Sequence, residues 1–277
     1  MKNIILLPIL SLFIALLLFF GSKAYHHAVL YEEATTQMVH FQGVGEQAKL
    51  KLEKWTKNLF GDIYEDTRKI NLDKLREKQH FMQSEAIKYT AYFMIVLLLL
   101  LFNYFILDLK LFTLLGSVLA MITLFFGLVS PILMVTIHKE VEYLGDIVLS
   151  FESKGIIGSI LKLFETGDIV VAIVILLFSV ITPILKIASL FFVTLFVESH
   201  FAHHLVAFFK MIGKWSMADV FVVAIFLVYL TANKGDVSRA EVEVGLYFFL
   251  SYVLVSMLVS LTADKLLHNH KTTQASS

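Results

Sequence analysis

The chain has 277 residues, of which 58% are hydrophobic, and its formal net charge is zero; its mean hydropathy is +0.78. It is far more apolar than a soluble globular domain, so the composition predicts an integral membrane protein. The balanced charge gives no sign of nucleic-acid binding. The absence of cysteine excludes disulfides, thiolate metal sites and cysteine nucleophiles, and it leaves the redox compartment open.

The first apolar run extends from Ile4 to Phe20 behind a single lysine, Lys2. Such a run fits either an uncleaved membrane anchor or a cleaved signal peptide. Its length favours an anchor over residues 1–21, although the small residues at 22 to 24 resemble a cleavage site.

Residues 22–88 form an extended polar segment, in which acidic and basic residues mix with Leu, Ile and Phe. Asp62 and Glu65 resemble a capping box with Asp in place of Ser or Thr. We therefore expect two helices, roughly 25–59 and 63–88, that continue the flanking membrane helices out of the bilayer as an extracytoplasmic hairpin. The hairpin is either a solvated spacer or a docking surface for another protein.

Further apolar runs are long enough to cross a bilayer, which gives about six transmembrane helices with the first run. They are Tyr89–Leu107, Leu111–Ile137, Ile169–Val197, Met217–Thr231 and Val244–Leu261. Residues 138–168 are mixed, because VEYLGDIVLSF alternates like a short strand and IIGSILKLF has helical spacing. The sequence thus predicts an all-α integral membrane protein with a helical extracytoplasmic hairpin and a small mixed extracytoplasmic segment.

The domain organisation follows from these runs. We expect an N-terminal anchor (1–21), the hairpin (22–88), a transmembrane domain (89–264) and a disordered tail (265–277). Lys210 and Lys214 lie in a short link without acidic residues, which favours a cytoplasmic position for that link. Alternation of the spans then places both termini in the cytoplasm.

Two prolines interrupt the apolar runs, Pro131 and Pro183. They are either tolerated kinks or breaks that open a cavity at mid-depth in the membrane. The hydroxyls of Thr136, Thr182 and Ser189 would line such a cavity, or would hydrogen-bond their own helices.

Two ionisable residues fall within the apolar spans, Lys186 and Asp219. An intramembrane charge is a functional hypothesis by default, and we expect these two to pair as a gate or protonation switch. The alternative is that Lys186 extends to the surface and Asp219 caps a helix start. Trp215, next to Lys214, is expected to be an interface anchor, since an indole prefers the head-group level.

His200, His203 and His204 share a helical face, but no third ligand is secured, so we expect a solvated or head-group-contacting cluster rather than a metal site. The sequence has no phosphate-binding glycine loop, nucleophile elbow or His-Glu-x-x-His motif. We therefore expect no cofactor and no enzymatic activity.

Four blocks together resemble the paraquat-inducible protein A family: SPILMVT (130–136), GIIGSILKLFETGD (155–168), TPILK (182–186) and KWSMADVFVVAI (214–225). The resemblance implies an inner-membrane protein of Gram-negative envelopes that works with MCE-domain proteins, which form lipid tunnels between the membranes. Two departures stand out: the cysteine-pair zinc ribbons are absent, and there is one module instead of two. A lone module would dimerise to rebuild the pair, or would act without that partner.

These features predict a transport-accessory protein that passes membrane lipids, or another apolar molecule, to an external partner. Two alternatives remain. One is an envelope stress sensor or scaffold that uses the 22–88 hairpin, and the other is a proton-coupled carrier that uses Lys186 and Asp219.

Overall fold

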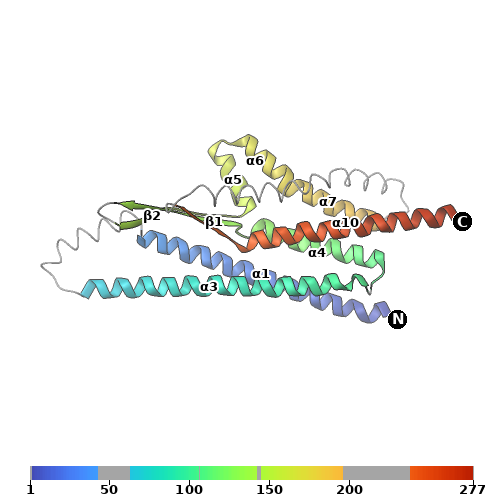
Figure 1. Ribbon diagram of the computed structural model, residues 1–277, viewed down its shortest axis with the longest axis horizontal. Coiled ribbons are helices and arrows are strands. Elements are labelled where there is room, and N and C mark those ends of the chain that lie inside the picture. Colours follow the sequence, from blue (N-terminus) through green and yellow to red (C-terminus); the bar gives the residue numbers. More distant parts are fainter. Residues whose placement is uncertain (1, 43–62, 106, 142–144, 196–237, 277) are drawn as a thin grey trace.

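The computed structural model describes residues 2–42, 63–105, 107–141, 145–195 and 238–276. The long helices run along one axis, and both ends of the chain lie toward the same end of the molecule (Figure 1). Within the described residues, five helices are long and apolar enough to cross a membrane: Pro8–Val39, Asp73–Tyr104, Leu109–Val129, Ile169–Leu195 and Val244–Leu266. Each overlaps a predicted span, and the remaining predicted span, Met217–Thr231, lies outside the described residues. The chain is a helical multi-pass membrane protein.

The first two helices form a long pair, α1 (Lys2–Gln42) and α3 (Ile63–Leu101), and the short 3-10 turn η1 (Phe102–Phe105) follows α3. Ala24, Ala28 and Ala34 of α1 are fully buried, because small side chains let two helices approach closely. Helix α1 continues from the first apolar run into the polar segment without a break, as expected. The rest of the predicted first hairpin helix, residues 43–59, lies outside the described part of the chain.

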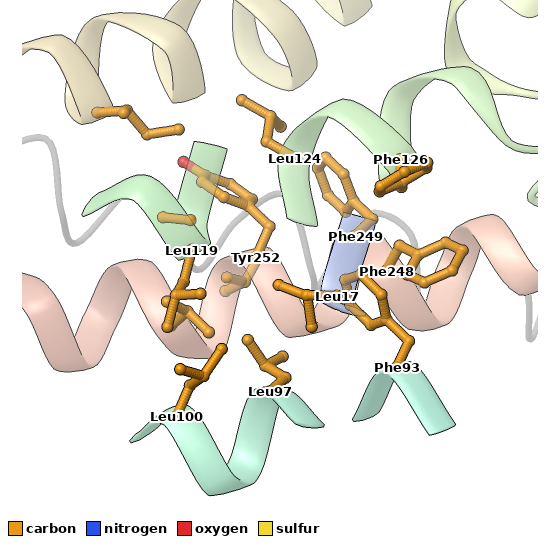
Figure 2. Close-up of a cluster of buried hydrophobic side chains, with 14 of the residues drawn as sticks. Leu17, Phe93, Leu97, Leu100, Leu119, Leu124, Phe126, Phe248, Phe249 and Tyr252 are labelled. Carbon is orange, nitrogen blue, oxygen red and sulfur yellow. The ribbon is translucent and has the colours of Figure 1, made fainter. Parts of the chain in front are cut away.

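A second pair, α4 (Leu109–Val129) and α10 (Val244–Ser276), packs against the first. Gly127 lies so close to α10 that a Cβ there would stand 2.8 Å from the backbone nitrogen of Phe249. Three rings from three helices, Phe93, Phe126 and Phe248, meet at centroid distances of 4.8–6.0 Å in the cluster that Figure 2 shows. This aromatic cluster joins the two helix pairs.

A three-stranded antiparallel sheet lies at the end of the molecule away from the termini, near the C-terminal part of α1 (Figure 1). Its order is β2 (Gly145–Lys154), β1 (Leu133–Val141) and β3 (Ser238–Val242). Each strand is joined to a helix: β1 follows α4, β2 leads into α5 (Ile156–Thr166), and β3 leads into α10. The amide of Gly245 donates to the carbonyl of Pro131 at 2.8 Å. The sheet therefore holds the ends of three helices together.

Two expectations are wrong. The predicted span Leu111–Ile137 is helical only to Val129, because Pro131 cannot donate a backbone hydrogen bond and favours extended backbone at Ser130, which has φ −73° and ψ 150°. The next residues pair as β1 instead. The expected disordered tail continues α10 as far as Ser276, in a stretch with no glycine or proline to end the helix. In the mixed segment, the predicted strand and helix are confirmed as β2 and α5.

Candidate functional site around Lys186

The apolar run from Ile169 to Leu195 changes its helical hydrogen bonding partway along. It consists of α6 (Ile169–Ile175), the π-helical segment η2 (Leu176–Ile181) and α7 (Thr182–Leu195). Within the described residues, this is the only π-helical segment. Such wide turns are rare and occur frequently at functional sites.

The change coincides with Pro183, the second residue of α7. Proline has no backbone N–H and its ring crowds the preceding turn, so a regular helix would be strained there. The backbone N–H of Thr182 donates to the carbonyl of Leu177, five residues earlier, and the Thr182 hydroxyl donates to the same oxygen at 2.8 Å. The wide turn thus accommodates the proline ring, and the Thr182 hydroxyl supports it.

Lys186 follows Thr182 by one helical turn and is only 7% exposed. Its Nζ donates to the Oγ of Ser256 in α10 at 3.2 Å, and Ser256 in turn donates to the carbonyl of Val253 at 3.0 Å. A charged amine in the hydrocarbon region is costly unless polar groups surround it. The structure therefore places the Lys186 side chain in the contact between α7 and α10. Its amine does not extend to the surface, as the alternative expected.

Ser189 lies on the same buried face of α7 and donates its hydroxyl to the carbonyl of Lys186 at 2.7 Å. The structure thus brings four predicted residues together in one helix: Thr182, Pro183, Lys186 and Ser189. The hydroxyls of Thr182 and Ser189 bond their own helix, as the simpler interpretation expected.

The other predicted site residues do not join this group. Pro131 lies in the loop after α4, and Thr136 is on β1, so neither belongs to a broken membrane helix. The broken-helix hypothesis is therefore wrong for the run that contains Pro131. In the run that contains Pro183, the helix does change from π-helical to α-helical hydrogen bonding, at Thr182. Asp219, Trp215 and Lys214 lie outside the described residues, and so do His200, His203 and His204.

The two halves of this run differ in exposure. Helix α7 buries one face against α4 and α10. Helix α6 buries only Ala172, and no residue of η2 is buried. The segment before Lys186 therefore presents apolar side chains outward, while the segment that carries Lys186 packs into the bundle.

Sequence reasoning missed Ser256, which accepts the hydrogen bond from Lys186. Little in the sequence indicated this contact, because a serine in an apolar helix usually donates to a carbonyl of its own helix. Ser251 and Ser260 in α10 do so. Among the described residues, no group of three or more His, Cys, Asp or Glu is arranged to hold a metal ion.

Residues 113–270 match the paraquat-inducible protein A family, which is more than half of the chain. The chain belongs to this family. A protein of Haemophilus influenzae described as a probable intermembrane transport protein is 29% identical over 112 residues. The similar region is 37% of this chain and 26% of that protein, so the chain matches about a quarter of that relative. No solved structure matches.

Proposed function

We propose that the protein is an inner-membrane component that moves lipid, or another apolar molecule, across the cell envelope. The observation that carries this proposal is the buried Lys186, whose Nζ bonds Ser256 at 3.2 Å, one turn after the π-helical segment. In a membrane, buried ionisable groups mark substrate or ion pathways, so a buried ammonium is a functional-site hypothesis by default. The phosphate of a phospholipid is the complementary partner for such an amine.

The exposed apolar surface of α6 and η2 supports a lateral route for lipid. Val170, Val174 and Leu177 are 77%, 48% and 45% exposed, so acyl chains can lie against this half of the run. The head group would pass the adjacent turn that carries Lys186. Asp219 would complete the gate as the counter-ion of Lys186.

The partner and the orientation belong to the same proposal. Both termini would lie in the cytoplasm, and the hairpin with the sheet would face the periplasm. An MCE-domain protein would dock on that periplasmic end and receive the lipid, either from one copy of this chain or from a homodimer. The similarity to the Haemophilus influenzae protein described as a probable intermembrane transport protein supports this role.

Site-specific photocrosslinking tests the route, with a photoreactive residue placed in turn at Ser189, Val193 and Leu185. Leu185 is 53% exposed and reports bulk lipid, whereas Ser189 and Val193 are 7% and 0% exposed on the packed face. We expect lipid capture at Leu185 and Ser189 but not at Val193. Capture at Leu185 alone would contradict a lipid route past Lys186.

Replacing the amine tests the mechanism. Lys186→Met should abolish lipid-transport complementation while the protein level in the membrane is unchanged, and Leu185→Met is the matched control. Full activity of Lys186→Met would remove Lys186 from the mechanism. Proton flux in liposomes without lipid capture would favour the carrier alternative.

A further inference from the structure

Helix α5 is fixed against the bundle along one of its sides. Ile156 and Ile160 are only 9% and 5% exposed, and α5 contacts both α4 and β2. Gly155, just before the helix, lies so close to the chain after α4 that a Cβ there would stand 2.8 Å from the carbonyl oxygen of Ser130. The helix therefore cannot turn freely about its axis, and its other sides have a set direction.

A second side of α5 is an apolar strip formed by Ile157, Leu161 and Phe164. Their spacing of four and three residues places them on one helix face, and they are 43%, 59% and 41% exposed. The third side is polar and carries Lys162 and Thr166. Ile157 and Thr166 are separated by about two and a half turns, so they point in opposite directions. The part of α5 that does not pack on the bundle is thus amphipathic.

The end of α5 lies next to the start of a membrane span. The helix ends at Gly167, which has a left-handed φ of 88°, and the N–H of Ala172 in α6 already donates to the carbonyl of Asp168 at 3.0 Å. Only Gly167 and Asp168 separate the two helices, and two residues reach at most about 7 Å. Helix α6 begins the span Ile169–Leu195 and lies beside α5 (Figure 1). The apolar strip is therefore at the membrane boundary.

Through this short turn, the apolar strip adjoins a surface that lies against lipid. Ile169, Val170 and Val171, at the start of α6, are 53%, 77% and 50% exposed. Contiguous apolar surface of this kind marks a protein or membrane interaction site. An amphipathic helix that adjoins a span is suited to lie in the membrane surface, with its apolar side toward acyl chains and its polar side toward water.

The charges around the apolar strip do not favour attachment by electrostatic attraction. Lys162 is the single basic residue of segment 155–168, and Glu165 and Asp168 are acidic, so the formal charge of the segment is one minus two, or −1. Attraction to anionic lipid needs an excess of basic residues. Binding of α5 to a membrane would therefore come from the apolar area that it buries.

We propose that α5 lies in the surface of the membrane leaflet nearest the sheet, with Ile157, Leu161 and Phe164 inserted among acyl chains and the polar side in water. The apolar strip is then covered by bilayer lipid rather than by a partner protein or a second copy of this chain. The proposal concerns the position of α5 and does not depend on the proposed transport.

Depth-dependent fluorescence quenching tests this position. The chain has no cysteine, so a single introduced cysteine carries the probe in the full-length protein, reconstituted in phosphatidylcholine nanodiscs. Ile157→Cys and Leu161→Cys label the apolar strip, and Thr166→Cys is the matched control on the opposite side. Nitroxide lipids labelled near the head group should quench the strip probes about threefold more than the control, because an interfacial helix buries its apolar face in the head-group region. Aqueous iodide should give the opposite order.

Three results would overturn the proposal. Strong iodide quenching in the strip would mean that it faces water, and no quenching there by either agent would mean that protein covers it. Equal lipid quenching of Thr166→Cys and the strip probes would mean that α5 is wholly immersed. Phe164→Cys provides a third strip position if one variant is not recovered folded.

A change of salt and lipid charge separates apolar insertion from electrostatic attachment. Raising the salt concentration, or replacing phosphatidylcholine with phosphatidylglycerol, should leave the order of lipid quenching unchanged, because salt screens charges but does not weaken apolar burial. Loss of lipid quenching in the strip at high salt would show electrostatic attachment and would contradict insertion. Each outcome is read without a transport assay.

Discussion

The two halves of the run from Ile169 to Leu195 both lie within one span that is apolar enough to cross a membrane, but they have different surroundings. The first half, α6 with η2, buries a single alanine, whereas α7 buries seven residues, including Lys186. The difference begins at the π-helical turn next to Pro183. Hydropathy reports that a segment prefers to leave water, but it does not distinguish contact with lipid from contact with protein.

The largest effect should come from a matched pair of leucines, one in each half of the run. Leu190 in α7 is 5% exposed and Leu177 in η2 is 45% exposed. Leu190→Ala should lower the free energy of unfolding by about 3 kcal/mol, because it leaves a cavity, while Leu177→Ala should change it by less than about 0.5 kcal/mol. Unfolding in mixed micelles measures both. Equal losses would mean that the first half is packed against protein as well.

The second-largest effect on stability should come from two glycines, one in a tightly packed position and one in an open position. A Cβ on Gly245 would stand 2.6 Å from the carbonyl oxygens of Ser130 and Pro131, whereas one on Gly158 would meet nothing within 4 Å. Gly245→Ala should cost about 2 kcal/mol through overpacking. Gly158→Ala, in the exposed part of α5, should stabilise by about 0.5 kcal/mol. The same unfolding assay applies, and a harmless Gly245→Ala would mean that the helix ends are not tightly held.

A smaller effect concerns the contact between α7 and α10. A double-mutant cycle with Lys186→Met and Ser256→Ala should give a coupling free energy of about 1.5 kcal/mol, the usual value for a hydrogen bond with a charged donor. Ser260→Ala, which removes a hydroxyl that bonds its own helix, should show no coupling to Lys186→Met. Additive losses for the first pair would exclude an energetic link between the two helices at this point.

The smallest effect should arise at the π-helical turn itself. Thr182→Val removes the hydroxyl bond to Leu177 but keeps the backbone bond to the same oxygen, so it should cost about 0.5–1 kcal/mol. Thr194→Val, which removes a hydroxyl bond within the regular part of α7, is the control. A much larger loss for Thr182→Val would show that the hydroxyl is required for the wide turn to form.

Local sequence predicted the membrane helices well, because apolar length and polar boundaries are properties of each segment. It failed at residues 133–137, which were read as the end of a membrane span although they follow a proline, and which form the first part of β1. The β-branched residues Val135, Thr136 and Ile137 after Pro131 were the available signal for a strand. The charges at Lys139 and Glu140 indicated only that the membrane span ends before them.

The pairing of β1 with β3 could not be predicted in this way. It joins residues about 100 positions apart, such as Leu133 and Val242, and no local pattern specifies the partner of a strand. The same reason applies to the site. Lys186 was found because a charge in an apolar run is conspicuous, whereas Ser256 was not, since its role depends on a contact between distant helices.

Backbone hydrogen bonds between the chain after α4 and the start of α10 limit how these two helices can move relative to each other. Two backbone bonds, from Gly245 to Pro131 and from Glu243 to Ile132, join these helices at one end, and Gly127 presses against the backbone of Phe249 farther along. Neither helix can slide along the other without breaking these hydrogen bonds, so α4 and α10 form a fixed frame. Under the proposed transport function, we therefore expect any rocking of the helices to take place at the borders of this frame, at α7 on one flank and at α1 with α3 on the other.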